Sequence, residues 1–303
     1  MVIKNFPSLV KKICLSFFLI LISVSVAYPS VKVDSTAYEK KLQDGIEAFY
    51  KTDWSRAGAI FIDLKEQSPQ DARAYFFHAM IPFWKYYFGN SSARAADLFL
   101  ERSEKAIEVS KNQLNANPHD TTMVLMLSGL YGYQSLVAAS EKQYRTAIQS
   151  GMTGFKYTRQ LLSLDADDPK ALIGKGTFYY MVGSVPNGLK WVTNMVGMSG
   201  DMQEGFKALE QAANSDTYVS NDAKMILTYL YKREKQYEKA LGHIKDLTHR
   251  YPENIIFQYN YAQLLEKCEQ VPAARKKYEH VLTMKTDVLP SLKEKSRSRI
   301  QNM

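Results

Sequence analysis

The chain has 303 residues, of which 46% are hydrophobic and 23% charged, and a formal net charge of +8 at pH 7. This composition is that of an ordinary soluble protein, of a size that allows one extended or two compact domains. Three lysines of the first 12 residues contribute to the charge, and the other basic residues mix with acidic ones, except at 293–299. Without a basic stripe, the charge argues against binding to nucleic acid.

The N-terminus, residues 1–27, has the layout of an export signal. Three lysines precede an uncharged run of 15 residues at 13–27, and the small residues Ser25 and Ala27 suit a signal peptidase. We expect cleavage after Ala27 and a periplasmic or envelope-associated protein. The alternative is an uncleaved membrane anchor, although the run falls short of the roughly 20 apolar residues that a spanning helix needs.

A small residue followed twelve positions later by proline recurs along the chain. The pairs are Ala57 with Pro69, Ala106 with Pro118, and Ala240 with Pro252. A small side chain lets two antiparallel helices approach closely, and proline ends the second helix because it cannot continue one. The spacing predicts an array of antiparallel helix pairs.

Two segments carry a more specific pattern. In "GIEAFYKTDWSRAGAIFIDLKEQSP" the small Gly45, the turn aromatic Trp54 and the closing Pro69 fall where tetratricopeptide repeats have them, and "LTYLYKREKQYEKALGHIKDLTHRYPEN" shows the same pattern. The chain therefore resembles the tetratricopeptide repeat (TPR) family. That resemblance implies an all-α fold, a right-handed superhelical solenoid of about six antiparallel helix pairs with the middle pairs lengthened. Residues 183–213 are locally similar to the inclusion-body clearance TPR proteins of the mitochondrial outer membrane, and no function is carried across from them.

The repeat units are expected at 38–69, 72–118, 121–169, 170–217, 221–253 and 255–287, followed by a basic C-terminal tail at 288–303. The units that end at Pro118 and Pro169 are longer than a standard repeat, and their persistent apolar periodicity predicts longer helices rather than loops. In the third unit the expected small position holds Tyr157, with Gly151 and Gly154 upstream. The helix register there stays open.

The stretch "AYFFHAMIPFWKYYFGN" at 74–90 places eight aromatic residues within 17 positions around Pro82. It is too short and too interrupted to cross a bilayer. We expect it to form the first helix of the second unit, kinked at Pro82. The repeat pattern turns Phe83 and Trp84 toward the groove, and burial in the core is the competing interpretation.

Short catalytic and metal-binding motifs are missing from the sequence. No two of the five histidines have the spacing of a metal pair, and "DADDPK" at 165–170 lacks the glycine of a calcium loop. The one cysteine outside the expected signal, Cys268, is predicted to be a buried hydrophobe. We expect no enzyme activity, no catalytic residues, no cofactor and no metal.

Two functions remain from the sequence. The first is a protein-protein interaction scaffold of the cell envelope that holds a peptide or helix of its partner along a concave groove. The resemblance assigns the groove to first-helix residues: Arg73, Phe76, Met80, Phe83, Trp84, Leu125, Ile173, Thr177 and Tyr180. The alternative is a carrier or transport accessory that holds a hydrophobic small molecule or lipid among the aromatics of 75–88 and the methionines of 181–202. An open aromatic ladder favours the scaffold, and an enclosed cavity favours the carrier.

Overall fold

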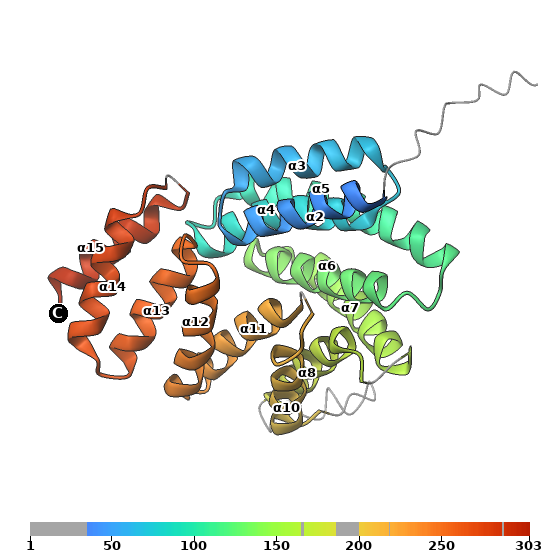
Figure 1. The fold of residues 1–303 in the computed structure, drawn as a ribbon. Coiled ribbons are helices and arrows are strands. Elements are labelled where there is room, and N and C mark those ends of the chain that lie inside the picture. Colours follow the sequence, from blue (N-terminus) through green and yellow to red (C-terminus); the bar gives the residue numbers. More distant parts are fainter. Residues whose placement is uncertain (1–34, 165–166, 186–199, 218, 287) are drawn as a thin grey trace, which may run out of the picture. The chain divides into compact units, whose positions relative to one another are not determined.

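The computed structural model describes residues 35–164, 167–185, 200–217, 219–286 and 288–303. Within these ranges it has thirteen helices and no strand (Figure 1). The helices are α2 (Ser35–Tyr50), α3 (Trp54–Gln67), α4 (Ala72–Phe88), α5 (Ala93–Ala116), α6 (Thr121–Ser140), α7 (Tyr144–Leu164), α8 (Pro169–Gly183), α10 (Met202–Ala213), α11 (Val219–Arg233), α12 (Tyr237–Arg250), α13 (Ile255–Lys267), α14 (Val271–Thr283) and α15 (Pro290–Gln301). The expected signal, 1–27, lies outside the described residues.

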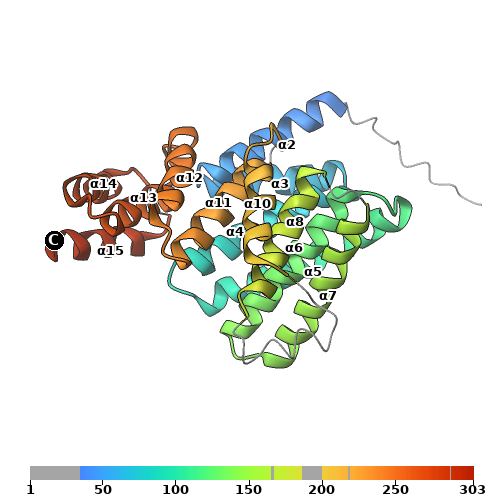
Figure 2. The same ribbon diagram turned by 90° about the horizontal axis from the view of Figure 1, so that it is seen from below.

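Neighbouring helices pack as pairs, and each pair packs on the next (Figures 1 and 2). The pairs are α2 with α3, α4 with α5, α6 with α7, α8 with α10, α11 with α12, and α13 with α14, and α15 packs on the last pair. The predicted all-α solenoid of about six helix pairs is confirmed. The middle helices are longer, as expected: α5 has 24 residues and α7 has 21, against 14 in α3 and α12.

Carboxylate or amide side chains fix where most of the first helices begin. Asp71, Asp120, Asp168 and Asn254 stand just before α4, α6, α8 and α13, and each side chain accepts a hydrogen bond from one or two backbone N–H groups of the first turn. These N–H groups have no partner within the helix, so the caps stabilise each start. Pro69, Pro118 and Pro252 precede such caps and close their units, whereas Pro169, expected to close the third unit, is the first residue of α8 and follows its cap Asp168.

The turn within a pair has the same backbone in four of the pairs. A residue in the left-handed region stands two positions before the second helix: Thr52 (φ 60°), Lys142 (φ 61°), Lys235 (φ 58°) and Glu269 (φ 60°). The N–H after it bonds to the carbonyl five residues back: Asp53 to Ala48, Gln143 to Ala138, Gln236 to Tyr231 and Gln270 to Leu265, at 2.8 to 3.0 Å. This is a Schellman ending. The repeat is therefore present in the backbone as well as in the residue pattern.

Small residues mark the helix crossings. A Cβ at Gly45 would lie 2.8 Å from the Phe61 ring, which matches the expected role of Gly45. In the third pair the small residue is Gly154, where a Cβ would lie 3.2 Å from the backbone of Gly132. Tyr157 instead stacks on a neighbouring tyrosine ring of α6 at 5.9 Å between centroids. The register left open by the sequence is the one with Gly154 at the crossing.

The basic segment at the C-terminus, 288–303, contains helix α15. Leu292 and Ser296 of α15 are buried, and the ammonium of Lys293 donates to the carbonyl of Met284 at 2.7 Å. Helix α15 thus covers the end of the last pair, as a capping element of a repeat array does.

Helix α6 is long and apolar enough to cross a membrane by length and composition alone. It packs against α5, α7 and α8, and 44% of its most apolar window is buried. A core helix of a soluble protein satisfies the same two criteria, so its contacts within the array account for its apolar sequence.

The crossing of α8 and α10 gives a stability test. A Cβ at Gly176 would lie 2.5 Å from Leu209 and 2.7 Å from the carbonyl oxygen of Gly205, whereas a Cβ at Gly242 of α12 would meet nothing within 4 Å. Gly176→Ala should lower the free energy of unfolding by on the order of 1–3 kcal/mol through overpacking. Gly242→Ala should raise it by about 0.5–1 kcal/mol through helix propensity. Urea unfolding of both variants measures this, and equal effects would contradict the crossing.

Candidate functional site

Helix α4 places Trp84 at the centre of an aromatic cluster. The Trp84 ring lies 4.7 Å from Phe49 of α2, 6.4 Å from Trp54 of α3 and 6.2 Å from Phe257 of α13, between centroids. Only 2% of Trp84 is exposed. The side of α4 that was expected to face a groove is therefore covered by the protein's own helices, including one from the last pair.

Phe83 is covered in the same way from the other direction. Its ring lies 5.2 Å from Phe99 of α5 and 4.5 Å from Tyr133 of α6. Helices α5 and α6 therefore both contribute to the cover over Phe83. Pro82, the preceding residue, is also buried within α4.

The other residues assigned to the groove divide into two sets. Buried together with Phe83 and Trp84 are Met80, Ile173 and Tyr180, and the Tyr180 hydroxyl donates to Glu234 at 2.5 Å. Their side chains belong to the core in this structure and present almost no surface to a partner. Partly exposed are Arg73, Phe76, Leu125 and Thr177. The structure thus does not bring the nine residues together as one continuous surface.

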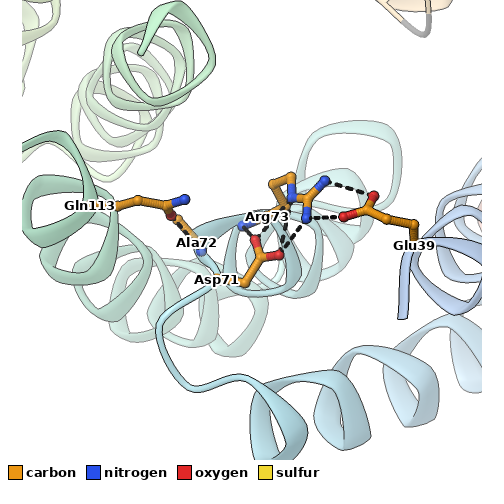
Figure 3. A network of polar contacts seen from close by, with 5 residues as sticks. All are labelled: Glu39, Asp71, Ala72, Arg73 and Gln113. Carbon is orange, nitrogen blue, oxygen red and sulfur yellow. Dashed lines mark hydrogen bonds and ion pairs between the residues drawn. The ribbon is translucent and has the colours of Figure 1, made fainter. Parts of the chain in front are cut away.

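Arg73 is engaged by carboxylates of its own chain (Figure 3). Its guanidinium donates to both oxygens of Glu39 on α2, at 2.6 and 2.9 Å, and to both oxygens of Asp71, the cap of α4. Burial opposes the charge of Arg73, but the bonds to Asp71 and Glu39 outweigh it and hold its pKa above its usual range. Arg73 ties the first two helix pairs together, and its donors are already used.

Tyr50, at the end of α2, joins the first repeat to the last repeats. Its hydroxyl donates to the carboxylate of Asp222 on α11, and its ring stacks on Tyr251 at 5.2 Å. The Asn254 side chain donates to the Tyr50 carbonyl at 2.6 Å. These partners are 172 to 204 residues away in sequence, and the sequence gives no sign of the contact. The interior between α2 and α11 is therefore closed by aromatic and polar side chains.

Burial raises the pKa of Asp222 from its ordinary 3.8 to about 6, although the hydrogen bond from Tyr50 opposes the rise. Burial, followed by the neighbouring Asp222, also holds the pKa of Tyr50 well above its usual value. The contact therefore carries a carboxylate whose charge is costly in the folded state. Its hydrogen bond from Tyr50 joins the first repeat to the fifth.

The described part of the chain has no cluster of three or more His, Cys, Asp or Glu side chains that could hold a metal ion. Cys268 is a free thiol, half-buried at the end of α13, and burial raises its pKa. A raised pKa disfavours the thiolate, which is the reactive form of cysteine.

The residues proposed to line a carrier pocket are dispersed. The aromatics of α4 fill one another's space, Met181 is 57% exposed on α8, and Met202 packs partly against the core. The other methionines and Trp191 of the insertion lie in 186–199, outside the described residues. Two cavities among the described residues, of about 430 and 350 Å³, contain none of these aromatics or methionines: one lies beside Leu289, the other between α3, α4 and α5.

The α6–α7 hairpin exposes a group of apolar side chains, which we call the hairpin patch: Leu136, Tyr144, Ile148 and Met152. Their exposed fractions are 44%, 65%, 63% and 64%. The three residues of α7 are spaced by four and share one face of the helix. Leu136 of α6 is next in the chain to Ser135, whose hydroxyl donates to the carbonyl of Ala147 on α7 at 2.7 Å. The sequence pattern placed the binding groove on the first helix of each pair, so it did not predict an interaction surface on α7, a second helix.

No family model matches the sequence, and no curated protein matches it. Solved structures to which the chain is similar include TTC0263, a thermophilic TPR protein of Thermus thermophilus, at 16% identity over 76% of this chain and 99% of that one, with a TM-score of 0.45. The human IFIT1 dimer with m7Gppp-AAAA is 16% identical over 84% and 52%, with a TM-score of 0.44. A tetratricopeptide repeat protein of Parabacteroides merdae is 13% identical over 87% of each chain, with a TM-score of 0.37.

The Asp222 contact predicts a pH dependence of stability. Between about pH 4 and pH 6 the folded state holds a proton on Asp222 that the unfolded state has lost, so stability falls as pH rises through this window. The loss is about 3 kcal/mol at 1.36 kcal/mol per pKa unit. Asp222→Asn keeps an oxygen for the Tyr50 hydroxyl and should remove that part of the fall.

The measurement is the free energy of unfolding in urea at pH 4 and pH 7 for the wild type and the variant. Asp246→Asn is the matched control, because Asp246 is an exposed residue on α12 that pairs with Lys224. The control should keep the wild-type difference between the two pH values. An Asp222→Asn variant with that same difference would show that the carboxyl is not buried against α2.

Proposed function

We propose that this protein is a non-catalytic interaction scaffold of the cell envelope that binds another protein through the hairpin patch. The observation that carries the proposal is the exposure of Tyr144, Ile148 and Met152 in one row on α7. Contiguous exposed apolar side chains on a soluble helical array are typical of an interaction surface. A rigid helix pair also holds them in fixed positions, so little conformational entropy is lost on binding.

Charge indicates what kind of partner fits. Neither α6 nor α7 contains an acidic residue, and α7 exposes Arg145, Lys156 and Arg159 beside the patch. The carboxylate of Glu141, in the turn between them, accepts a hydrogen bond from the Tyr86 hydroxyl at 2.6 Å. A surface of apolar residues with a basic rim is complementary to an amphipathic segment that carries carboxylates. We infer a partner helix or strand with an apolar face and acidic flanks.

The residues predicted to line the groove support this proposal, because most of them already contact other residues of the protein. Its Met80, Phe83 and Trp84 contribute to the core, and Arg73 is bound to Glu39 and Asp71. Partner binding along the first helices would have to separate these contacts. The hairpin patch needs no such rearrangement.

The patch gives a binding test. Ile148→Ser with Met152→Ser should reduce capture of the partner from the native envelope by about tenfold or more, because central apolar residues carry most of the energy of an interface. Arg145→Glu should weaken it as well. Met181→Ser is the control, since Met181 is similarly exposed on α8. Crosslinking followed by quantitative mass spectrometry measures the capture.

A second measurement distinguishes a membrane from a protein partner. The amount of protein that floats with vesicles containing anionic lipids should be the same for the wild type and the double serine variant. If the double serine variant captures the same proteins as the wild type but loses vesicle binding, the patch is a lipid-binding surface and the scaffold proposal is wrong.

Export rests on the N-terminal pattern of lysines, apolar residues and the small Ser25 and Ala27. Protein isolated from its native cells should have an intact mass without residues 1–27, and its N-terminal peptide should begin at Tyr28. Ala27→Pro should block the cleavage and leave the leader in the mass. A full-length mass in the wild type would favour the membrane-anchored alternative.

A further inference from the structure

A cavity of about 350 Å³ lies between α3, α4 and α5, away from the hairpin patch. Trp54, Gly58 and Ile62 of α3 line one side, and Ile81 and Pro82 of α4 line another. Most of this lining is apolar. The size is at the lower end of the range of small-molecule sites.

Pro82 leaves a polar group at the cavity. It has no N–H, so the carbonyl of His78, four residues earlier, loses its partner within α4. Arg102 of α5 replaces that partner, because its Nη1 donates to the His78 carbonyl at 3.2 Å. One bond uses one of the five guanidinium donors. None of the ion pairs between described residues includes Arg102, and burial lowers its pKa although the nearby Glu101 opposes this.

The ring of His78 adds a second donor. Its Nδ1 lies 2.9 Å from the ammonium of Lys65, which has no acceptor of its own, so Nδ1 accepts and the proton of the neutral ring is on Nε2. Burial, then Arg102 and Lys65, lowers the pKa of His78 to about 3, so the ring stays neutral. His78 is 8% exposed and lines the cavity. The Nε2–H is then the ring donor that the Lys65 contact leaves for a ligand.

The charges around the cavity are of one sign. Lys85 of α4 lines it, with its ammonium 5.8 Å from the Trp54 ring, and Arg102 lines it from α5. Lys65 lies behind His78. No acidic side chain lines the cavity among the residues that the structure describes, although Glu101 is close enough to act on Arg102. Arg102 and His78 are thus donors among a mostly apolar lining, in which the described residues include no carboxylate to accept from them.

We propose that this cavity binds a small amphipathic monocarboxylate, whose carboxylate accepts from Arg102 and His78 and whose hydrocarbon part contacts Trp54, Ile81 and Pro82. The planar guanidinium suits a carboxylate because two N–H groups can point at its two oxygens. The apolar lining favours an organic acid over inorganic phosphate. This site is independent of the proposed scaffold function, because it uses α3 to α5 and none of the hairpin patch.

Decanoate is the probe, titrated by isothermal calorimetry below its micelle-forming concentration, with decan-1-ol as the uncharged analogue. We expect decanoate to bind the full chain and decan-1-ol to bind at least about tenfold more weakly, since a charge-assisted pair contributes more than 1.4 kcal/mol, a factor of ten. Arg102→Gln keeps a donor for the His78 carbonyl but loses the charge, and should weaken decanoate about tenfold. Arg94→Gln is the control and should bind like the wild type, because Arg94 is an exposed arginine of α5 that does not line the cavity.

Gly58→Leu is the second variant, and it does not depend on removing a charge. A Cβ at Gly58 would meet only Ile81, at 3.8 Å, so the fold should tolerate a side chain that fills the cavity. Its melting temperature should be at or above the wild-type value, and decanoate binding should be lost. Any one of three results overturns the proposal: no binding of decanoate to the wild type, equal binding of the alcohol, or wild-type binding to a folded Gly58→Leu.

Discussion

Helix α4 has no continuous polar face, because only Arg73, His78 and Lys85 interrupt its apolar and aromatic residues, and this constraint limits how the other helices can pack. Eleven of its 17 residues are buried. A helix without a polar face has to be surrounded, and α4 is surrounded: α3 and α5 cover two sides, α2 and α6 contact it, and Phe257 of α13 reaches Trp84. The aromatic stretch, for which the sequence pattern predicted a groove-facing side, is therefore a hydrophobic centre of the array.

The Tyr50 contact completes this centre. Because a repeat array is held mainly by contacts between neighbours, a bond from α2 to α11 adds a link that the nearest-neighbour pattern lacks. Tyr50 supplies it with a ring against Tyr251 and a hydroxyl on Asp222. Burial at this junction of the first and fifth pairs disfavours the charged form of Asp222, which is why its pKa is raised. The inner side of the array is thus closed by specific polar contacts as well as by aromatic packing.

The sequence could predict what local chemistry determines. Caps such as Asp71, small residues such as Gly45 and closing prolines mark helix ends and crossings within one unit. It could not choose Gly154 over Tyr157, because both positions suit a helix and only the approach of α6 distinguishes them. For Trp84 it left the groove and the core as two interpretations, and only the packing of α2, α3 and α13 around the ring distinguishes them. Contacts across 172 residues, like that of Tyr50, leave no periodic trace.

Two features are not required for the stability of the fold: the exposed apolar row on α7 and the remaining donors of Arg102. Buried aromatics such as Phe83 are explained by packing, and Arg73 is explained by its carboxylates. The exposed row of Ile148 and Met152 is not explained by either, since exposed apolar area on α7 contributes nothing to the core. Packing and ion pairing also leave unexplained the N–H donors of Arg102 other than the one that bonds to the His78 carbonyl. Pro82 leaves the His78 carbonyl without its partner in the helix, and the Arg102 guanidinium donates to that carbonyl instead. The charge of Arg102 therefore lies at a mostly apolar cavity whose described lining residues include no carboxylate. The arginine that stabilises the Pro82 position in α4 can thereby also bind the carboxylate of a ligand.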